Sequence, residues 1–231
     1  MAVITFANTK GGAGKTTAAL ILATELARGG ARVTVLDADP QRWISSWHAV
    51  SGVIPNIEVI SEITLASIQG HISENRRSTD YFVIDLAGAR NSLLATAIGL
   101  SDHVLIPIQG CSMDAKGGAQ VLELLAEIKA TTGIEIDHSV VLTRVNSLVT
   151  TRALQVVKDL LASRQVRVLE TPIIERAAFR DIFDWGGTLQ TLDPARVSNL
   201  DKARDNARMF GDEVRRLVPQ RRAPSGFRRA A

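Results

Sequence analysis

The chain has 231 residues, 45% of them hydrophobic and 22% charged, and a formal net charge of +3. This size and composition predict one domain, at residues 1–218, with a sizeable core. No apolar run is long enough for a membrane-spanning helix. The aromatic fraction of 4% argues against a platform that stacks nucleic-acid bases, and the single cysteine, Cys111, excludes an internal disulfide and favours a reducing, cytoplasmic setting.

Short apolar runs alternate with longer helical patterns along the chain. Strands are predicted at residues 3–7, 32–36, 57–60, 81–85, 103–108, 139–143 and 166–169. Helices are predicted at 15–29, 62–75, 91–99, 114–131, 150–164 and 175–184. Several strands are apolar almost throughout, as strands covered on both faces are. The alternating order predicts an α/β fold with a doubly wound, mostly parallel sheet and helices on both faces.

The last helix is predicted at residues 194–218. Its apolar positions step by three or four, which gives one stripe for packing. On its outer surface we expect the ion pairs Asp201–Arg204, Asp205–Arg208 and Asp212–Arg216. From Lys202 onward the chain holds nine basic and three acidic residues, so its basic character is C-terminal. Residues 219–231 are predicted to form a flexible basic tail.

A glycine-rich segment, KGGAGKTT at residues 10–17, joins the first strand to the first helix. Glycines let backbone N–H groups close around a phosphate, and the helix N-terminus adds partial positive charge. Lys15 would reach the β- and γ-phosphates, and the Thr16 hydroxyl would hold Mg²⁺. The predicted phosphate cradle consists of Gly11, Gly12, Ala13, Gly14, Lys15, Thr16 and Thr17. The segment therefore predicts a P-loop for a nucleoside triphosphate.

Two features of this loop depart from the usual P-loop. Thr9 stands where the standard pattern has glycine, and Lys10 adds a second lysine at the front. The motif resembles the deviant Walker A of the ParA/MinD family of ATPases, and the chain is most similar to its small ParA members of the ParF and VirC type. The resemblance covers roughly residues 1–190. It implies ATP and Mg²⁺ as cofactors, and a Lys10 that crosses a dimer interface to the partner subunit's nucleotide.

Carboxylates follow two of the predicted strands. Asp37 and Asp39 are two residues apart, so they face the same way, and Pro40 stiffens the turn after them. The element resembles the family's Asp-x-Asp-Pro-Gln, which implies that Asp39 orients the attacking water and Asp37 supports the Mg²⁺ shell. A solvated turn is the alternative. Asp85 ends an apolar strand in the Walker B pattern, which holds Mg²⁺ through water.

Further residues are assigned by the resemblance. Gln109 follows a strand and would lie near the dimer face. Arg144 would help to frame the adenine. That Arg144 is an ordinary surface arginine is an equal alternative. The loop from Pro172 resembles the adenine-side loop, whose backbone contacts the base. Trp43, Trp47 and Trp185 are expected to pack or to lie at an interface.

The family resemblance implies a ParA-type partition ATPase. ATP would bridge two subunits into a two-fold homodimer that binds DNA without sequence preference, and a centromere-binding ParB-like adaptor would stimulate slow hydrolysis. Such a protein is expected to be cytoplasmic and associated with the nucleoid. The candidate DNA contacts are Arg180, Arg196, Arg204, Arg208, Arg215 and Arg216. A solvated, ion-paired helix face is the alternative for each arginine.

Four other functions use related chemistry. A ParA-like positioner of a protein cargo would look the same in sequence. A MinD-like membrane switch needs a bulky amphipathic tail, but Phe227 is the one bulky apolar residue after Pro219, so no membrane association is expected. A nitrogenase-type iron protein needs two cluster cysteines, and a dethiobiotin-synthetase-like ligase would not need Lys10.

Overall fold

A seven-stranded sheet forms the centre of the molecule, which the computed structural model describes at residues 1–109, 112–146 and 152–219. The strands are β1 (Ala2–Phe6), β2 (Val33–Ala38), β3 (Ile57–Ile60), β4 (Tyr81–Leu86), β5 (His103–Gln109), β6 (His138–Val145) and β7 (Ile173–Ile174). They are hydrogen-bonded in the order β3-β2-β4-β1-β5-β6-β7, and every pair is parallel. Cys111, the start of the helix predicted at 150–164 and residues 220–231 of the predicted tail lie outside the described residues.

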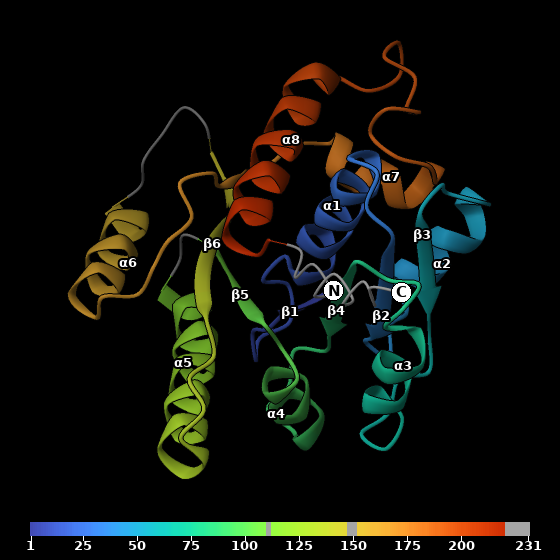
Figure 1. The fold of residues 1–231 in the computed structure, drawn as a ribbon. Coiled ribbons are helices and arrows are strands. Elements are labelled where there is room, and N and C mark those ends of the chain that lie inside the picture. Colours follow the sequence, from blue (N-terminus) through green and yellow to red (C-terminus); the bar gives the residue numbers. More distant parts are fainter. Residues whose placement is uncertain (110–111, 147–151, 220–231) are drawn as a thin grey trace, which may run out of the picture.

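Helices cover both faces of this sheet (Figure 1). One core contains α1 (Lys15–Arg28), α2 (Trp43–Ser51), α7 (Ala178–Trp185) and α8 (Leu200–Leu217). The other contains α3 (Ile68–Asn75), α4 (Ser92–Gly99), α5 (Ser112–Thr132) and α6 (Arg152–Ser163). The predicted doubly wound α/β fold is therefore confirmed, with a sheet that is parallel throughout its described strands.

Strand β1 illustrates why the strands are apolar. All five of its residues are buried. Ile4 and Phe6 belong to the core with α1 and α8, whereas Val3 belongs to the opposite core. Side chains alternate along a strand, so a strand covered on both faces has no position for a solvated residue.

The carboxyl ends of β1, β2 and β4 meet at one edge of the sheet. β4 lies between the other two, and its Asp85 is opposite Asp37 of β2 on one side and Phe6 of β1 on the other. Just beyond β1, the Asn8 side chain donates a 2.7 Å hydrogen bond to the carbonyl of Pro107 in β5. The pairing register thus places the glycine-rich loop beside two carboxylates.

The prediction of a strand at residues 166–169 is wrong. Only Val168 of this segment forms a β-bridge, which pairs it with Val140 of β6. The edge strand of the sheet is β7, four residues further along. The carboxylate of Glu213 in α8 accepts 2.8 Å hydrogen bonds from the backbone N–H groups of Glu170 and Thr171. A side chain from another element therefore takes the donors that would have extended a strand here.

The predicted helix boundaries also need correction. The last helix begins at Leu200 instead of residue 194, because Asn199 is left-handed with φ 55° and separates it from a short turn capped by Asp193. Helix α3 begins at Ile68 rather than residue 62. Helix α2 was not predicted, since its nine residues bury only Ile44 and Trp47 and leave a weak periodic signal.

Candidate functional site

The glycine-rich loop has the backbone shape that its sequence predicts. Gly12 and Gly14 have φ angles of 80° and 89°, a left-handed conformation that favours glycine. Thr143 of β6 supports the loop, since its hydroxyl donates a 2.8 Å hydrogen bond to the carbonyl of Ala13. Gln109 of β5 donates from its side-chain amide to the carbonyl of Gly12. Side chains of two strands, β5 and β6, therefore fix the loop through its carbonyl groups.

Lys15 extends back along the loop from the first turn of α1. It is 5% exposed, and its ammonium group donates a 3.1 Å hydrogen bond to the carbonyl of Lys10. Burial lowers the pKa of Lys15, while the charges of Asp85 and Asp39 act in the opposite direction. A cation held inside a ring of backbone amides is suited to bind a phosphate.

Asp37 and Asp85 form a buried pair of carboxylates next to this loop. Within the described part of the chain, both oxygens of Asp85 and Oδ1 of Asp37 are buried without a hydrogen-bond partner. The other oxygen of Asp37 accepts hydrogen bonds from the N–H and the hydroxyl of Ser45, at 2.8 and 2.6 Å. Open, buried carboxylate oxygens are the ligands that a hard divalent cation prefers, so these residues fit Mg²⁺.

Asp85 is also electrostatically unusual. Burial raises its pKa to about 7, and the charges of Asp37 and Asp39 add to this, whereas the nearby Thr16 hydroxyl and Lys15 lower it. A cation bound beside these carboxylates would relieve the repulsion between them. No three acidic, histidine or cysteine side chains of the described residues form a ready-made metal cluster.

A cleft of about 750 Å³ brings the predicted residues together. From the predicted set it is lined by Gly11, Gly12, Gly14, Lys15, Thr16, Thr17, Asp39, Arg144 and Arg180. Sequence reasoning did not assign four further residues to this cleft, although they line it: Trp43 of α2 and Phe179, Phe183 and Asp184 of α7. Trp43 is 53% exposed, and the signal for its role was its position two residues after the Asp-Pro-Gln element.

Five predicted nucleotide-site residues do not line this cleft, namely Lys10, Ala13, Asp37, Asp85 and Pro172. The backbone N–H of Lys10 donates to Asn8 Oδ1 at 2.9 Å, and its side chain packs over Gly117 of α5, where a Cβ would lie 3.0 Å from Lys10 Cγ. The carbonyl of Pro172 accepts a 2.8 Å hydrogen bond from Asn206 of α8. The residues after Pro172 border a smaller cavity of about 40 Å³ that adjoins the cleft.

The six candidate DNA-binding arginines do not form one group. Arg180 lies at the cleft and pairs with Glu175 at 3.1 Å. Arg196 pairs with Asp193 at 3.6 Å and lies over the ring of Trp185. Arg204 is half-buried, because it donates to the carbonyls of the loop before α8.

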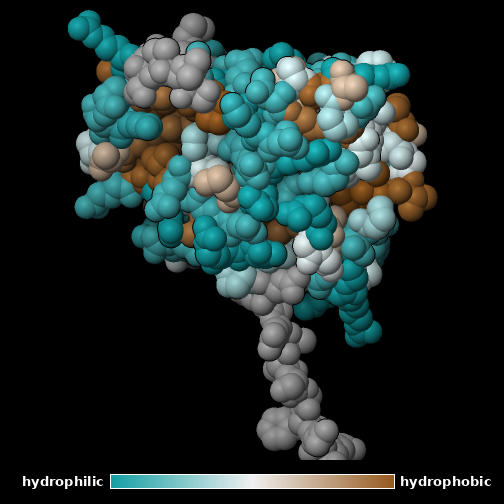
Figure 2. Space-filling view, turned by 90° about the horizontal axis from the view of Figure 1, so that it is seen from above, coloured by the Kyte–Doolittle hydropathy of each residue, from teal (hydrophilic) through white to brown (hydrophobic). Residues whose placement is uncertain are grey.

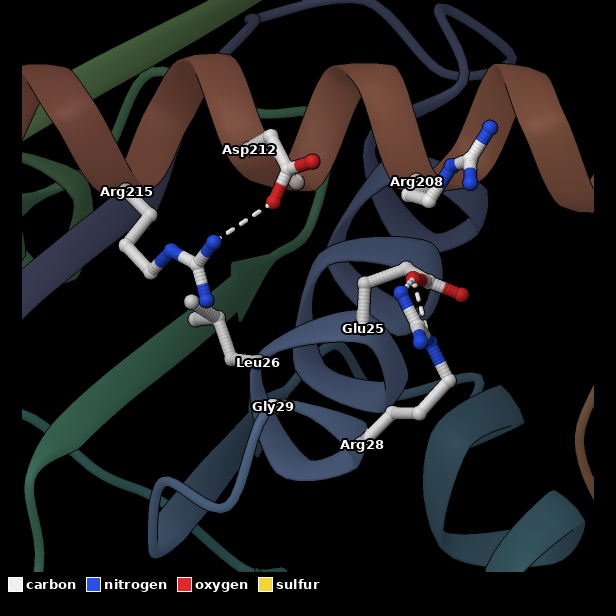
Figure 3. Close-up of a pocket in the computed structure, with 8 residues that line it drawn as sticks. Glu25, Leu26, Arg28, Gly29, Arg208, Asp212 and Arg215 are labelled. Atoms are coloured by element: carbon white, nitrogen blue, oxygen red, sulfur yellow. Dashed lines mark hydrogen bonds and ion pairs between the residues drawn. The ribbon is translucent and has the colours of Figure 1, made fainter.

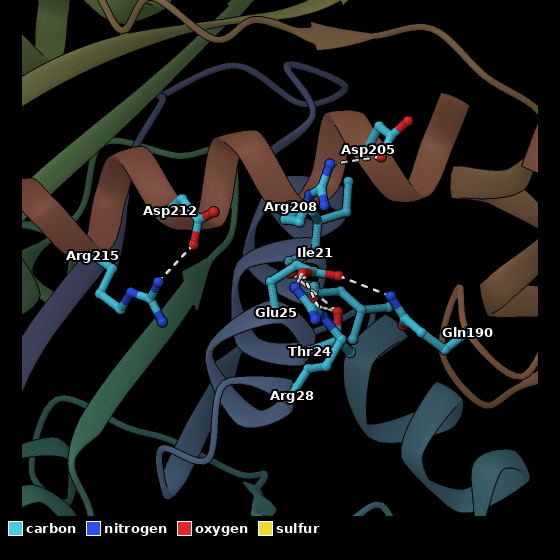
Figure 4. A network of polar contacts seen from close by, with 10 residues as sticks. Ile21, Thr24, Glu25, Arg28, Gln190, Asp205, Arg208, Asp212 and Arg215 are labelled. Atoms are coloured by element: carbon cyan, nitrogen blue, oxygen red, sulfur yellow. Dashed lines mark hydrogen bonds and ion pairs between the residues drawn. The ribbon is translucent and has the colours of Figure 1, made fainter. Parts of the chain in front are cut away.

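The remaining candidates lie further along α8. Arg208 pairs with Asp205 at 2.9 Å, as predicted. Asp212 pairs with Arg215 at 2.7 Å, so the predicted pair of Asp212 with Arg216 is wrong. Both arginines line a pocket against α1, with Arg208 on the side of Glu25 and Arg28 and Arg215 on the side of Leu26, as Figures 3 and 4 show. Arg216 is exposed.

Seen from above the view of Figure 1, the surface is mostly hydrophilic with smaller hydrophobic patches, as Figure 2 shows. No helix among the described residues combines the length and the apolar character that crossing a membrane requires.

The fold and the site define the class of protein. A glycine-rich loop that leads from the first strand of a parallel sheet into a helix, with carboxylates on β2 and β4, is typical of P-loop nucleotide-binding proteins.

Comparison with known proteins shows the family. A family model described as VirC1 protein matches residues 1–218, and the chain belongs to this family of ParA/MinD-like ATPases. The protein ParA of Rhizobium radiobacter is 36% identical over 210 residues, which are 91% of this chain and 94% of the relative. The protein virC1 of Rhizobium rhizogenes is 29% identical over 198 residues, which are 83% and 84% of the two chains. The resemblance to the ParA/MinD family is therefore confirmed.

A solved structure shares the fold. The complex of Cyanothece McdA(D38A) with ATP superposes with a TM-score of 0.74 at 18% identity, over 96% of this chain and 99% of that one. At this identity the likeness shows the fold alone.

Proposed function

We propose that this protein is a partition ATPase that binds ATP and Mg²⁺ in the cleft and hydrolyses ATP. The observation that carries the proposal is the convergence of the P-loop, Lys15 and the open carboxylate oxygens of Asp37 and Asp85 at one edge of the sheet. Phosphates are bound by cations and backbone N–H groups, and Mg²⁺ is bound by oxygen ligands. This edge of the sheet supplies both sets of groups.

Each residue then has a role in hydrolysis. Lys15 and the amides of residues 11–17 bind the phosphates, while Thr16, Asp37 and Asp85 hold Mg²⁺ directly or through water. When held by these residues, Mg²⁺ would supply positive charge against the charge that develops on the phosphate oxygens. Asp39 lines the cleft and orients the attacking water. Arg144, also in the cleft, and the backbone after Pro172 contact the base.

The proposal includes an ATP-bridged homodimer in which Lys10 serves the partner's site. Its support is the position of Lys10, which lies at the front of the loop but does not line its own cleft. The loop around it is anchored, since Thr9 donates to the carbonyl of Gly117 at 3.3 Å. A cation supplied across an interface stabilises the transition state only when the dimer has formed, which makes hydrolysis slow in the monomer.

DNA is the proposed second ligand, bound through phosphate contacts at the nucleoid. Arg208 and Arg215 support this, since their side chains are 55% and 52% exposed and their aspartate partners lie on the same helix. Exposed ion pairs contribute little, so phosphates can replace the aspartates. The remaining candidate contacts are Arg180, Arg196, Arg204 and Arg216. A ParB-like adaptor protein is the proposed stimulator.

The test is ATP hydrolysis by the full chain with DNA alone, the adaptor from the same replicon alone, and both. We expect joint stimulation by both, and its loss in Lys10→Ala, which should still bind ATP. DNA affinity should require ATP and fall steeply with salt, and Arg208→Ala with Arg215→Ala should reduce the salt dependence. Arg90→Ala, which removes an exposed arginine paired with Glu127, is the matched control. Equal DNA affinity with ATP and ADP would contradict the switch.

A further inference from the structure

Thr9, which stands where the usual P-loop has glycine, contacts helix α5. Its hydroxyl donates a hydrogen bond to Oε1 of Gln120 and, over a longer distance of 3.3 Å, to the carbonyl of Gly117. Glycine has no side chain, so a loop with glycine at this position could make neither contact. The departure from the usual loop therefore ties the residue before Lys10 to α5.

The backbone of Lys10 is fixed from β5 and α5 together. The buried Asn8 side chain accepts a 2.9 Å hydrogen bond from the N–H of Lys10 and donates to the carbonyl of Pro107 in β5 at 2.7 Å. Gly117 of α5 leaves the space for this arrangement, because a Cβ there would overlap Asn8 Oδ1 and lie 3.1 Å from the N of Lys10. The front of the loop is therefore packed directly against the first turns of α5.

The contact between Thr9 and Gln120 lies outside the nucleotide cleft. Neither residue belongs to the described lining of that cleft. On the cleft side, the carbonyl of Lys10 is held separately by the ammonium group of Lys15, at 3.1 Å. Lysine carries its charge on a long flexible stem, so its ammonium group reaches a fixed point only when its backbone is held in place. The hydroxyl of Thr9 thus supports Lys10 without contributing to the phosphate cradle of its own subunit.

We propose that Thr9 and Gln120 are positioning residues for Lys10, whose hydrogen bond holds the loop so that the ammonium group of Lys10 reaches the partner subunit's nucleotide. The inference rests on the proposed function, in which Lys10 acts across an ATP-bridged dimer. The transition state carries the charge that Lys10 stabilises, so the pair contributes to kcat and leaves ATP affinity unchanged. A displacement of a catalytic group by about 1 Å can cost about a hundredfold in rate.

The test measures turnover of the full chain with Mg²⁺, DNA and the adaptor from the same replicon, and ATP affinity by calorimetry. Thr9→Val keeps the shape of the side chain and removes the hydroxyl, so kcat should fall by about ten- to a hundredfold with KM and ATP affinity preserved. Thr9→Ser, which keeps the hydroxyl, should retain wild-type kcat. Gln120→Met should resemble Thr9→Val, and the double variant should lose no more than either single one, because both remove the same hydrogen bond. Thr131→Val is the matched control, since its hydroxyl bonds to carbonyls of its own helix.

Mixing two variants separates an effect on the partner's site from an effect on the subunit's own site. Asp39→Ala lacks the carboxylate that orients water but keeps a supported Lys10. In a mixed dimer with Thr9→Val, the intact cleft of the Thr9→Val subunit meets the supported Lys10 of the other subunit. Each variant alone should be slow, whereas an equal mixture should regain about a quarter of the wild-type turnover, since one site in two works in about half of the dimers.

The outcomes distinguish this inference from the proposed function. Wild-type kcat in Thr9→Val, a parallel loss of ATP affinity, or no recovery on mixing overturns the positioning role while the proposed function stands. A wild-type chain that does not hydrolyse ATP, or one whose turnover is unchanged in Lys10→Ala, contradicts the proposed function itself.

Discussion

We expect Gly88→Ala to weaken ATP binding while leaving most of the stability of the fold intact. Gly88 lies three residues after Asp85, where the chain passes over the front of the P-loop. A Cβ at this position would lie 2.5 Å from the carbonyl carbon of Lys10 and from the N of Gly11, and 2.7 Å from the carbonyl oxygen of Lys10. These are backbone atoms, so the two loops must separate to admit the methyl group.

The size of the effect follows from this crowding. Adding a methyl group to a tight contact typically costs about 1–3 kcal/mol. Without nucleotide the two loops can move apart, because Gly11 is exposed and Gly88 is half-buried. ATP requires the loop amides to close around its phosphates, so the penalty falls on binding. The expected loss of ATP affinity is therefore about 5- to 150-fold.

The assay is a titration with ATP and Mg²⁺, together with thermal unfolding without nucleotide. The matched control is Gly70→Ala in α3, where a Cβ would have nothing within 4 Å. This control should bind ATP like the wild type and gain slightly in stability, since alanine favours the helix. Gly88→Ala protein that binds ATP as tightly as this control would refute the argued contact between the two loops.

Three further predictions concern stability. Burial lowers the pKa of His103 to about 4, so His103 becomes protonated in the unfolded chain at a higher pH than in the folded one. The free energy of unfolding should therefore drop by up to about 3 kcal/mol as the pH falls from 6.5 to 4. His103→Gln should remove this pH dependence in urea titrations. Gly211→Ala should lower the free energy of unfolding by about 1–2 kcal/mol, because its Cβ would lie 2.8 Å from that of Glu25. Ser45→Ala should lower it by about 1–2 kcal/mol without Mg²⁺, because buried Asp37 loses a hydroxyl donor.

Each of these has a clear contrary result. Parallel pH profiles for the wild type and His103→Gln would contradict the burial argument. If Gly211→Ala is as stable as Gly70→Ala, the close approach of α1 and α8 is wrong. Wild-type stability of Ser45→Ala in magnesium-free buffer would show that the hydroxyl does not support Asp37.

The sequence by itself determined the local elements of this protein. Strand and helix order, and hence the parallel α/β fold, followed from alternating apolar runs, because a strand buried on both faces has little freedom in composition. The phosphate loop followed from the spacing of its glycines and Lys15, since the contacts it makes are made largely by its own backbone. Short elements such as α2 have too few buried residues to leave a periodic pattern in the sequence. They form because they pack against the rest of the fold, so sequence analysis missed them.

Tertiary structure alone decided what residues far apart in the chain do together. The register of β2 on β4 set Asp37 beside Asp85, and the carboxylate of Glu213 ended the strand predicted at 166–169. It also buried the Nε of Arg176 without a hydrogen-bond partner among the described residues. A hydrogen bond depends on the distance between two atoms, and for distant residues only the folded chain fixes that distance.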